Sequence, residues 1–285
     1  MKCLLIGNLT VDEIGDKLVV GGPGYYGGWA LHLLGCEVHL VSSMSDKYRS
    51  LYRELYGVFR IHEVPCDSNP RFIIRNGRAV GLVEEGCSIP VDYLENVIDD
   101  VGPDLVVFSP VYGELNGKHI VRVKDRFTSM DIQGFTRRIV GGDVVNVWSD
   151  ELFRLFRYVD LVHGNIREYT FTNRFSELIS RIRSVSEELT TGFFISMDER
   201  GLYLIHSGRI YYFPPVEVEV VSDVGAGDIL LAVTSYYMCR GYGLLESTIR
   251  GLSATLSKIS SRDRVWFDEK RIEEGVKQIK FIEIP

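Results

Sequence analysis

The sequence has few cysteines and no long hydrophobic run. Its five cysteines lie apart, without C-x-x-C spacing, which argues against both a disulfide framework and a zinc site. We expect Cys3 and Cys36 to be small core residues. No stretch has the length of a transmembrane helix, and the apolar run at residues 1–6 is too short for a signal peptide. These absences predict a cytoplasmic protein.

Positive charge is also scarce. The 285 residues include 32 Lys and Arg against 39 Asp and Glu, which gives a formal net charge of −7. Nucleic-acid-binding proteins normally present a basic surface, so we expect no nucleic-acid partner, and we expect no membrane partner either. The histidines are scattered without ligand spacing, so no transition-metal site is predicted.

The pattern of apolar residues predicts one α/β domain over residues 1–285, with strands and helices in alternation. Such alternation is typical of a mostly parallel sheet covered by helices on both faces. Expected strands lie at residues 2–7, 37–42, 104–109, 128–132, 161–163, 193–196 and 203–205. Expected helices lie at residues 26–34, 51–56, 91–99, 150–157 and 228–260, the last with a break at 241–243.

Two segments, residues 12–21 and 59–88, fall outside this alternation. The second contains Asn76-Gly77 between two strand-like runs, a strong hairpin signal. We expect the two segments to form a small β-sheet inserted in the domain, used as a lid over a site or as a dimer surface. The protein is accordingly predicted to be a monomer or a homodimer through this lid.

The segment Gly225-Ala226-Gly227-Asp228 lies between an alternating β-branched run at 218–221 and an apolar run at 229–238. This pattern predicts a strand, a tight loop and a buried helix. The backbone N–H groups of the loop would form an anion site for a transferring phosphate. Asp228 repels phosphate, but it is well placed to take a proton from an attacking hydroxyl. The alternative is that Asp228 only caps the helix.

A second glycine pattern, at residues 22–27, matches the dinucleotide fingerprint G-x-G-x-x-G, with Asp46 about twenty residues further on. Residues 12–20 separate the pattern from the first strand, however, and Pro23 and two tyrosines crowd its turn. A nicotinamide or flavin enzyme is therefore the less favoured alternative. The Walker A lysine motif is absent, which excludes a P-loop NTPase.

Together, the motifs resemble the PfkB carbohydrate kinase (ribokinase-like) family over essentially the whole chain. Gly21-Gly22 matches the hinge before that family's substrate-facing helix, and residues 225–228 match its G-A-G-D motif. Asn165 and Glu168 match its N-x-x-E motif, and residues 196–201 lie where the family has a nucleotide loop. The resemblance implies a three-layer α/β/α core with a small β-sheet lid. It also implies a kinase that uses ATP and Mg²⁺.

The resemblance implies a role for each matching residue. Asp228 would be the catalytic base, and the N–H groups of Gly225, Ala226 and Gly227 would stabilise the transferring phosphate. Asn165 and Glu168 would hold Mg²⁺ through water. The residues implied at the nucleotide are Asn165, Ser196, Asp198, Gly201, Gly225 and Gly227. Two positions depart from the family pattern: Ser222 replaces a carboxylate before the glycines, and Asp198 replaces a glycine.

Residues 24–31 and 131–135 look like those of archaeal and plant myo-inositol kinases. This likeness implies a polyol or sugar acceptor, most of all myo-inositol. The residues implied at its hydroxyls are Asp12, Gly22, Tyr25, Tyr26, Asp131 and Gln133. The carboxylates have an alternative role as turn formers, and the tyrosines have one as packing residues. A ribokinase, a nucleoside or other sugar kinase, and a ligand-binding member without catalysis are the other functions considered.

Overall fold

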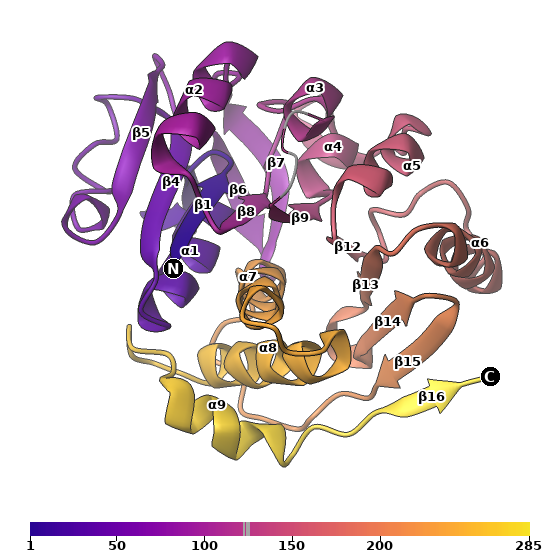
Figure 1. Cartoon of the computed structure of the whole chain (residues 1–285). Coiled ribbons are helices and arrows are strands. Elements are labelled where there is room, and N and C mark those ends of the chain that lie inside the picture. Colours follow the sequence, from indigo (N-terminus) through magenta and orange to yellow (C-terminus); the bar gives the residue numbers. More distant parts are fainter. Residues whose placement is uncertain (122, 124–125) are drawn as a thin grey trace.

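A ten-stranded sheet forms the centre of the molecule (Figure 1). The computed structural model describes residues 1–121, 123 and 126–285. In spatial order the strands are β16 (Ile282–Ile284), β15 (Arg209–Phe213), β14 (Leu202–His206), β13 (Gly192–Ser196), β12 (Leu161–Asn165), β9 (Phe127–Asp131), β8 (Leu105–Phe108), β1 (Lys2–Ile6), β4 (Glu37–Met44) and β5 (Arg60–Pro65). The strands from β13 through β5 are parallel, and β14, β15 and β16 are antiparallel additions. The predicted mostly parallel sheet is confirmed.

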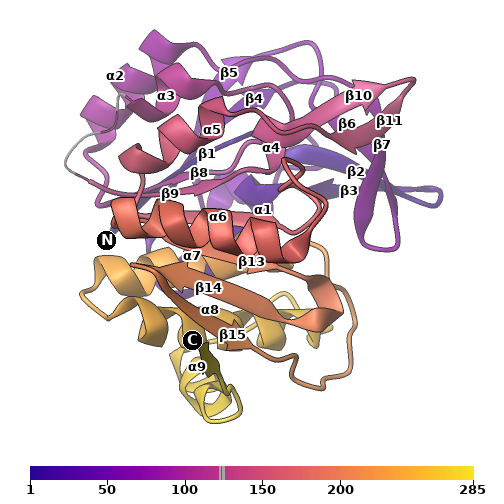
Figure 2. The same ribbon diagram turned by 90° about the vertical axis from the view of Figure 1, so that its right-hand side faces the viewer.

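Helices cover both faces of this sheet (Figures 1 and 2). One hydrophobic core joins the sheet to α1 (Pro23–Leu33), α7 (Ala226–Cys239), α8 (Leu244–Ile259) and α9 (Glu269–Val276). The core on the other face joins it to α2 (Val91–Val101), α3 (Gly117–Val121), α5 (Glu151–Leu155) and α6 (Phe175–Glu188). The short α4 (Gln133–Thr136) follows β9. The two cores confirm the three-layer α/β/α architecture. No helix in the described part of the chain is long and apolar enough to cross a membrane.

A second sheet of six strands stands off the large one (Figure 2). In spatial order its strands are β10 (Arg137–Val140), β11 (Asp143–Asn146), β7 (Arg78–Glu84), β6 (Arg71–Arg75), β2 (Thr10–Ile14) and β3 (Lys17–Gly21). Both residues of the predicted Asn76-Gly77 turn have positive φ, 49° and 71°, as a tight hairpin requires. The predicted insert at 59–88 differs from the structure at its start, because β5 joins the large sheet. The β10–β11 hairpin was not predicted.

Two local predictions were wrong. Residues 218–221, expected as a strand, have no regular structure. Both edges of β15 are already paired, with β14 and β16, so a β-branched run that follows it finds no free edge there. Instead, the N–H groups of Val221 and Ser222 donate to the carbonyl of Ile259 at 2.7 and 3.1 Å. The helix expected at 51–56 is reduced to turns and the 3-10 helix η1 (Leu55–Gly57).

The cysteine prediction needs a correction. Cys3 and Cys36 are buried in the core as expected, but Cys66 and Cys87 form a disulfide with a Cα–Cα distance of 5.8 Å. Cys66 follows β5 of the large sheet, and Cys87 follows β7 of the small one. The pairing was not predicted because a spacing of 21 residues carries no local signal, and the two cysteines meet only when both sheets form. The disulfide therefore ties the hairpin of the small sheet to the core.

Replacing both Cys66 and Cys87 with serine is expected to lower the free energy of unfolding by about 3 kcal/mol. The reason is that the bond closes a loop of 21 residues in the unfolded chain. Urea titration of the oxidised protein and of the variant measures the difference. Cys239→Ser, at a half-buried free cysteine, is the control and should change stability much less. Equal midpoints for all three proteins would show that the disulfide contributes nothing.

Candidate active site

Asp228 lies in the first turn of α7, directly after a loop whose glycines are required by close packing. A Cβ atom at position 225 would lie 2.1 Å from the Cγ of Tyr26, and one at position 227 would lie 2.5 Å from the Cε1 of His163. Gly225 is the N-cap, with φ 79°. N–H groups in the first helical turn have no intrahelical acceptor. The helix start can therefore bind an anion next to the Asp228 carboxylate.

One of the three predicted N–H donors is already engaged. The N–H of Ala226 donates to the carbonyl of Asp223 at 3.1 Å, so it closes the turn in this conformation. The N–H groups of Gly225 and Gly227 remain for a phosphate. The turn that sets the helix start therefore uses one of the three N–H groups that were predicted to bind phosphate.

Asp131 and His163 form a buried pair at the carboxyl ends of neighbouring strands. The two residues are in register on β9 and β12, and the Oδ2 of Asp131 lies 2.6 Å from the Nδ1 of His163. The other carboxylate oxygen accepts the N–H of Gln133 at 2.7 Å. Burial lowers the pKa of His163, but Asp131, Glu168 and Asp228 outweigh burial and the pKa is raised. The Nε2 of His163 is buried without a hydrogen-bond partner among the described residues.

His163 was not predicted as a site residue. A signal was present, since it immediately precedes Gly164-Asn165 at the end of a predicted strand, where ligands bind in parallel sheets. Its partner Asp131 was predicted at a strand end for a different reason. What the sequence does not show is that β9 and β12 are neighbours, because 32 residues separate the pair.

The site gathers several carboxylates around one arginine. Burial raises the pKa of Asp228 to about 8, with a further contribution from Asp131, and raises that of Asp12 to about 6. Burial also raises the pKa of Glu168. Arg137, at the start of β10, lowers the pKa of all three groups. It was not predicted because it belongs to the unexpected hairpin of the small sheet. Arg137 thus provides compensating charge for Asp12 of the small sheet, Asp228 of α7 and Glu168 after β12.

Two of the predicted acceptor residues, Asp12 and Tyr26, each lie against a glycine of the predicted motifs. Asp12 is only 4% exposed and accepts a hydrogen bond from Thr10 Oγ1 at 2.7 Å. The Gly21-Gly22 hinge packs beside it, since a Cβ at Gly21 would overlap the Asp12 carboxylate. Burial raises the pKa of Tyr26, with further contributions from Asp12, Tyr25 and Asp228, and its ring packs against Gly225.

Tyr25 lies among aromatic side chains. Its ring packs against Trp29 and Trp266, with centroids 6.3 and 6.2 Å apart. The charged groups that affect its hydroxyl are Arg264 and Glu54, not the site carboxylates. The rings of Tyr25 and Tyr26 contact each other, with centroids 5.0 Å apart, and the acceptor role of both residues stays a prediction.

Asp198 is the centre of a polar network among the residues predicted to bind the nucleotide and Mg²⁺. The side-chain amide of Asn165 donates to Asp198 Oδ1 at 3.0 Å, and the Asn165 N–H donates to Glu168 Oε2 at 2.7 Å. Asp198 also pairs with Arg167 and, at 3.2 Å, with Arg78 from the small sheet. The negative charge that replaces a glycine of the family pattern is therefore compensated by two arginines.

Ser196 and Gly201 lie at the two ends of the predicted nucleotide loop that contains Asp198. Ser196 ends β13, and its carbonyl accepts the N–H of Ile166 at 2.9 Å. Gly201 has φ 88°, and a Cβ there would lie 2.2 Å from the carbonyl oxygen of Phe213. Among the described residues, no three His, Cys, Asp or Glu side chains group together to hold a metal ion. The contact of Asn165 and Glu168 with Mg²⁺ through water stays a prediction.

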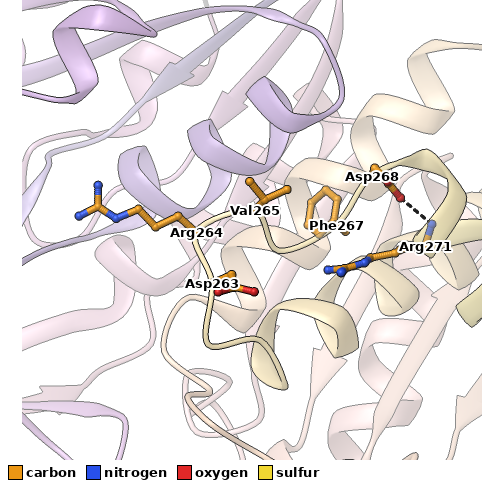
Figure 3. A pocket seen from close by; sticks show the side chains of 6 residues that line it. All are labelled: Asp263, Arg264, Val265, Phe267, Asp268 and Arg271. Carbon is orange, nitrogen blue, oxygen red and sulfur yellow. Dashed lines mark hydrogen bonds between the residues drawn. The ribbon is translucent and has the colours of Figure 1, made fainter.

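A surface hollow of about 430 Å³ lies elsewhere, at the connection between α8 and α9 (Figure 3). Its lining residues are Asp263, Arg264, Val265, Phe267, Asp268 and Arg271. Asp268 caps α9 by accepting the N–H of Arg271 at 2.8 Å. None of the predicted site residues lines this hollow, so we do not assign it to the reaction.

The three-layer core, the second sheet and the half-buried aspartate at a glycine-rich helix start are the features expected of a carbohydrate kinase of the ribokinase fold. The sequence pattern of the "pfkB family carbohydrate kinase" matches residues 112–260, more than half of the chain. The protein therefore belongs to the pfkB family of carbohydrate kinases and is a phosphotransferase. None of the curated proteins matches the sequence.

Solved structures share the fold at low sequence identity. A variant of a pyrophosphate-dependent myo-inositol-1 kinase, converted into a myo-inositol-3 kinase, has a TM-score of 0.78 and 18% identity over 96% of this chain and 98% of its own. A pyrophosphate-dependent ribokinase-family kinase, in complex with a pyrophosphate analog and myo-inositol, has a TM-score of 0.78 and 19% identity over 97% and 99%. A putative ribokinase II from E. coli has a TM-score of 0.72 and 13% identity over 97% and 99%.

Proposed function

We propose that this kinase phosphorylates a hydroxyl of a cyclitol or sugar, with myo-inositol as the first candidate and ATP with Mg²⁺ as the donor. The observation that carries the proposal is the position of Asp228 in the first turn of α7, directly after the glycine loop against which the Tyr26 ring packs. Carboxylate and phenol groups suit a polyol because they accept and donate hydrogen bonds to adjacent hydroxyls. The likeness of residues 24–31 and 131–135 to myo-inositol kinases selects the cyclitol.

The reaction needs little covalent chemistry from the protein. Asp228 orients the acceptor hydroxyl and takes its proton as the hydroxyl oxygen bonds to the terminal phosphorus and the bond to the leaving phosphate breaks. The N–H groups of Gly225 and Gly227 stabilise charge on the phosphate oxygens. When bound, Mg²⁺ neutralises charge on the donor phosphates. The small sheet excludes water, which limits wasteful hydrolysis of the donor.

Inorganic pyrophosphate is the second candidate donor. A specific observation supports it: the β6–β7 hairpin of the small sheet contacts both the predicted nucleotide loop at 196–201 and the segment just before Gly225. Arg78 pairs with Asp198 at 3.2 Å, and a Cβ at Gly77 would lie 2.3 Å from Asp223 Oδ1. Arg78 and Arg167 place two positive charges where a donor made only of phosphates would bind. Two of the structural neighbours are described as pyrophosphate-dependent kinases.

One assay matrix tests acceptor and donor together. ATP or pyrophosphate is supplied with Mg²⁺, and phosphorylated product is measured with myo-inositol, ribose, fructose, fructose 6-phosphate, adenosine and cytidine. The proposal expects the highest kcat/KM with myo-inositol. Preference for ribose or a nucleoside would move the assignment to another branch of the family. Thermal stabilisation by ligand without product in any combination would favour a member that binds without catalysis.

Asp12→Asn is expected to lower kcat/KM for the acceptor by about 100-fold, since a hydrogen bond to a charged group contributes about 1.5–3 kcal/mol. Stability should not fall. The pKa of Asp12 in the folded protein, about 6, is above that of an unfolded aspartate, so the ionised group costs stability above that pH. Kinetics and thermal unfolding at pH 8 measure both effects. Glu13→Gln, on the same strand, is the control. Unchanged acceptor kinetics would remove Asp12 from the acceptor site.

A further inference from the structure

Lys258 is a buried cation that the reaction described above does not use. It lies near the end of α8 and is 5% exposed. Its Nζ donates to the carbonyl of Ser222 at 3.1 Å and to that of Val224. No carboxylate lies within ion-pair distance of it among the residues that the structure describes. Both partners are thus backbone oxygens of the segment that leads into the Gly225–Gly227 loop.

The contact with Val224 fixes the orientation of the peptide unit that joins Val224 to Gly225. The carbonyl of Val224 and the N–H of Gly225 belong to the same peptide unit, whose planarity makes them point in opposite directions. Because the Lys258 ammonium binds the Val224 carbonyl, the N–H of Gly225 points away from Lys258. The same end of α8 holds the preceding residues, because the Ile259 carbonyl accepts the N–H groups of Val221 and Ser222.

Electrostatics add to the geometry. The Nζ of Lys258 lies 5.0 Å from the centre of the Tyr26 ring, and the Tyr26 ring packs against Gly225. Burial lowers the pKa of Lys258 to about 8, while Asp223 and Asp228 act in the opposite direction. A positive charge behind the loop strengthens binding of a negative phosphate in front of it, because a buried site screens charge weakly. An ammonium without a carboxylate partner is costly to bury, which argues for a role beyond packing.

We infer that Lys258 is a positioning residue that acts as a built-in monovalent cation, which orients the loop before Gly225 and supplies charge behind the phosphate site. The inference rests on the proposed phosphoryl transfer. Two consequences follow. The wild-type enzyme should need no added monovalent cation at this pair of carbonyls. Removing the Lys258 ammonium should leave a site between the two carbonyls that a small ammonium ion can bind.

The test compares Lys258→Met, which keeps the apolar stem, with Lys258→Ala, which leaves space. Both variants are expected to lose about 100-fold in kcat, as when a preorganised donor is removed from an anion site, with little change in KM for the acceptor. Propylammonium and ethylammonium should restore the kcat of Lys258→Ala but not that of Lys258→Met. Tetramethylammonium, which has no N–H to donate, should restore neither. Lys277→Ala, at an exposed lysine, is the control.

Wild-type turnover in buffers that contain only tetramethylammonium as monovalent cation completes the test. Full turnover there is expected. Strong activation of the wild type by K⁺ or NH₄⁺, or a Lys258→Met variant with wild-type kcat, would overturn the inference even if Lys258→Ala fails to fold. Binding of inorganic pyrophosphate, measured by calorimetry, should weaken in Lys258→Met. If the wild type itself transfers no phosphate to any acceptor, the proposed function fails, independently of Lys258.

Discussion

Asp228→Asn is expected to lower kcat by about three orders of magnitude, within the range that general acid–base catalysis supplies. The variant keeps the shape of the side chain but loses the ability to take a proton from the acceptor. Donor binding should persist, because the N–H groups of Gly225 and Gly227 and the charge of Lys258 are unchanged. Steady-state kinetics give kcat, and calorimetry with ATP and with pyrophosphate gives binding.

The same variant separates a base from a helix cap. A carboxylate that serves only the helix dipole contributes about 0.3–1 kcal/mol to stability and nothing to the chemical step. Near-wild-type turnover with slightly reduced stability would therefore assign Asp228 to capping. Asp263→Asn, at an exposed aspartate, controls for the change of net charge.

The pH profile gives a second readout of the same substitution. The base works only when ionised, and burial beside Asp131 raises the pKa of Asp228 to about 8. The kcat/KM of the wild type should therefore rise with pH up to about 8. Loss of the Lys258 proton, with a pKa of about 8, limits the rise above that range. In Asp228→Asn the ascending limb should disappear, and an unchanged ascending limb would assign it to another group.

Arg137→Met is expected to lower the free energy of unfolding by about 3–5 kcal/mol at pH 8, the cost of leaving buried charges uncompensated. Burial lowers the pKa of Arg137, and Glu168, Asp131, Asp228 and Glu114 raise it. Its guanidinium also packs over Phe72, 5.4 Å from the ring centre, and donates to the carbonyl of Val111 at 3.3 Å. Methionine keeps the apolar stem, so the substitution removes mainly the charge.

The loss of stability should depend on pH. Without Arg137, the folded-state pKa values of Asp12, Glu168 and Asp228 rise further above their unfolded values. An acid of this kind costs stability at pH values above its unfolded pKa, and the cost grows until the pH passes the folded pKa. Urea titrations at pH 5 and pH 8 should therefore show the larger deficit at pH 8. Arg138→Met, at the exposed neighbour, is the control, and equal effects of the two variants would contradict the proposed role of Arg137.

Local patterns predicted most of the large elements. The alternation of apolar strands and helices predicted the central sheet, and the continuous apolar run after Asp228 predicted α7, which is buried along most of its length. The break at 241–243 was confirmed between Cys239 and Leu244. These features could be predicted because strand and helix periodicity are properties of consecutive residues.

Long-range pairing accounts for the elements that were missed. The run at 218–221 has strand propensity but no sheet edge to pair with, and propensity does not encode the availability of an edge. The β10–β11 hairpin is short and becomes recognisable only through its place in the small sheet. The Cys66–Cys87 disulfide likewise requires both sheets.

The candidate site shows the same division. The sequence pattern around Asp228 predicted a glycine loop and a helix start, because backbone shape at a helix start is a local property. The roles of Asp12, Asp131, Asn165 and Glu168 came from the resemblance to the family and stay predictions. The electrostatic partners of these residues, Arg137, His163 and Lys258, come from elements that are distant in sequence. They meet because parallel strands bring their carboxyl ends to one edge and the small sheet folds over it. Packing also gives the adjacent Tyr25 and Tyr26 different neighbours, which the sequence does not show because those neighbours lie far away along the chain or on another turn of the helix. Both rings contact Trp266, but Tyr26 lies against Gly225 and Tyr25 against Trp29.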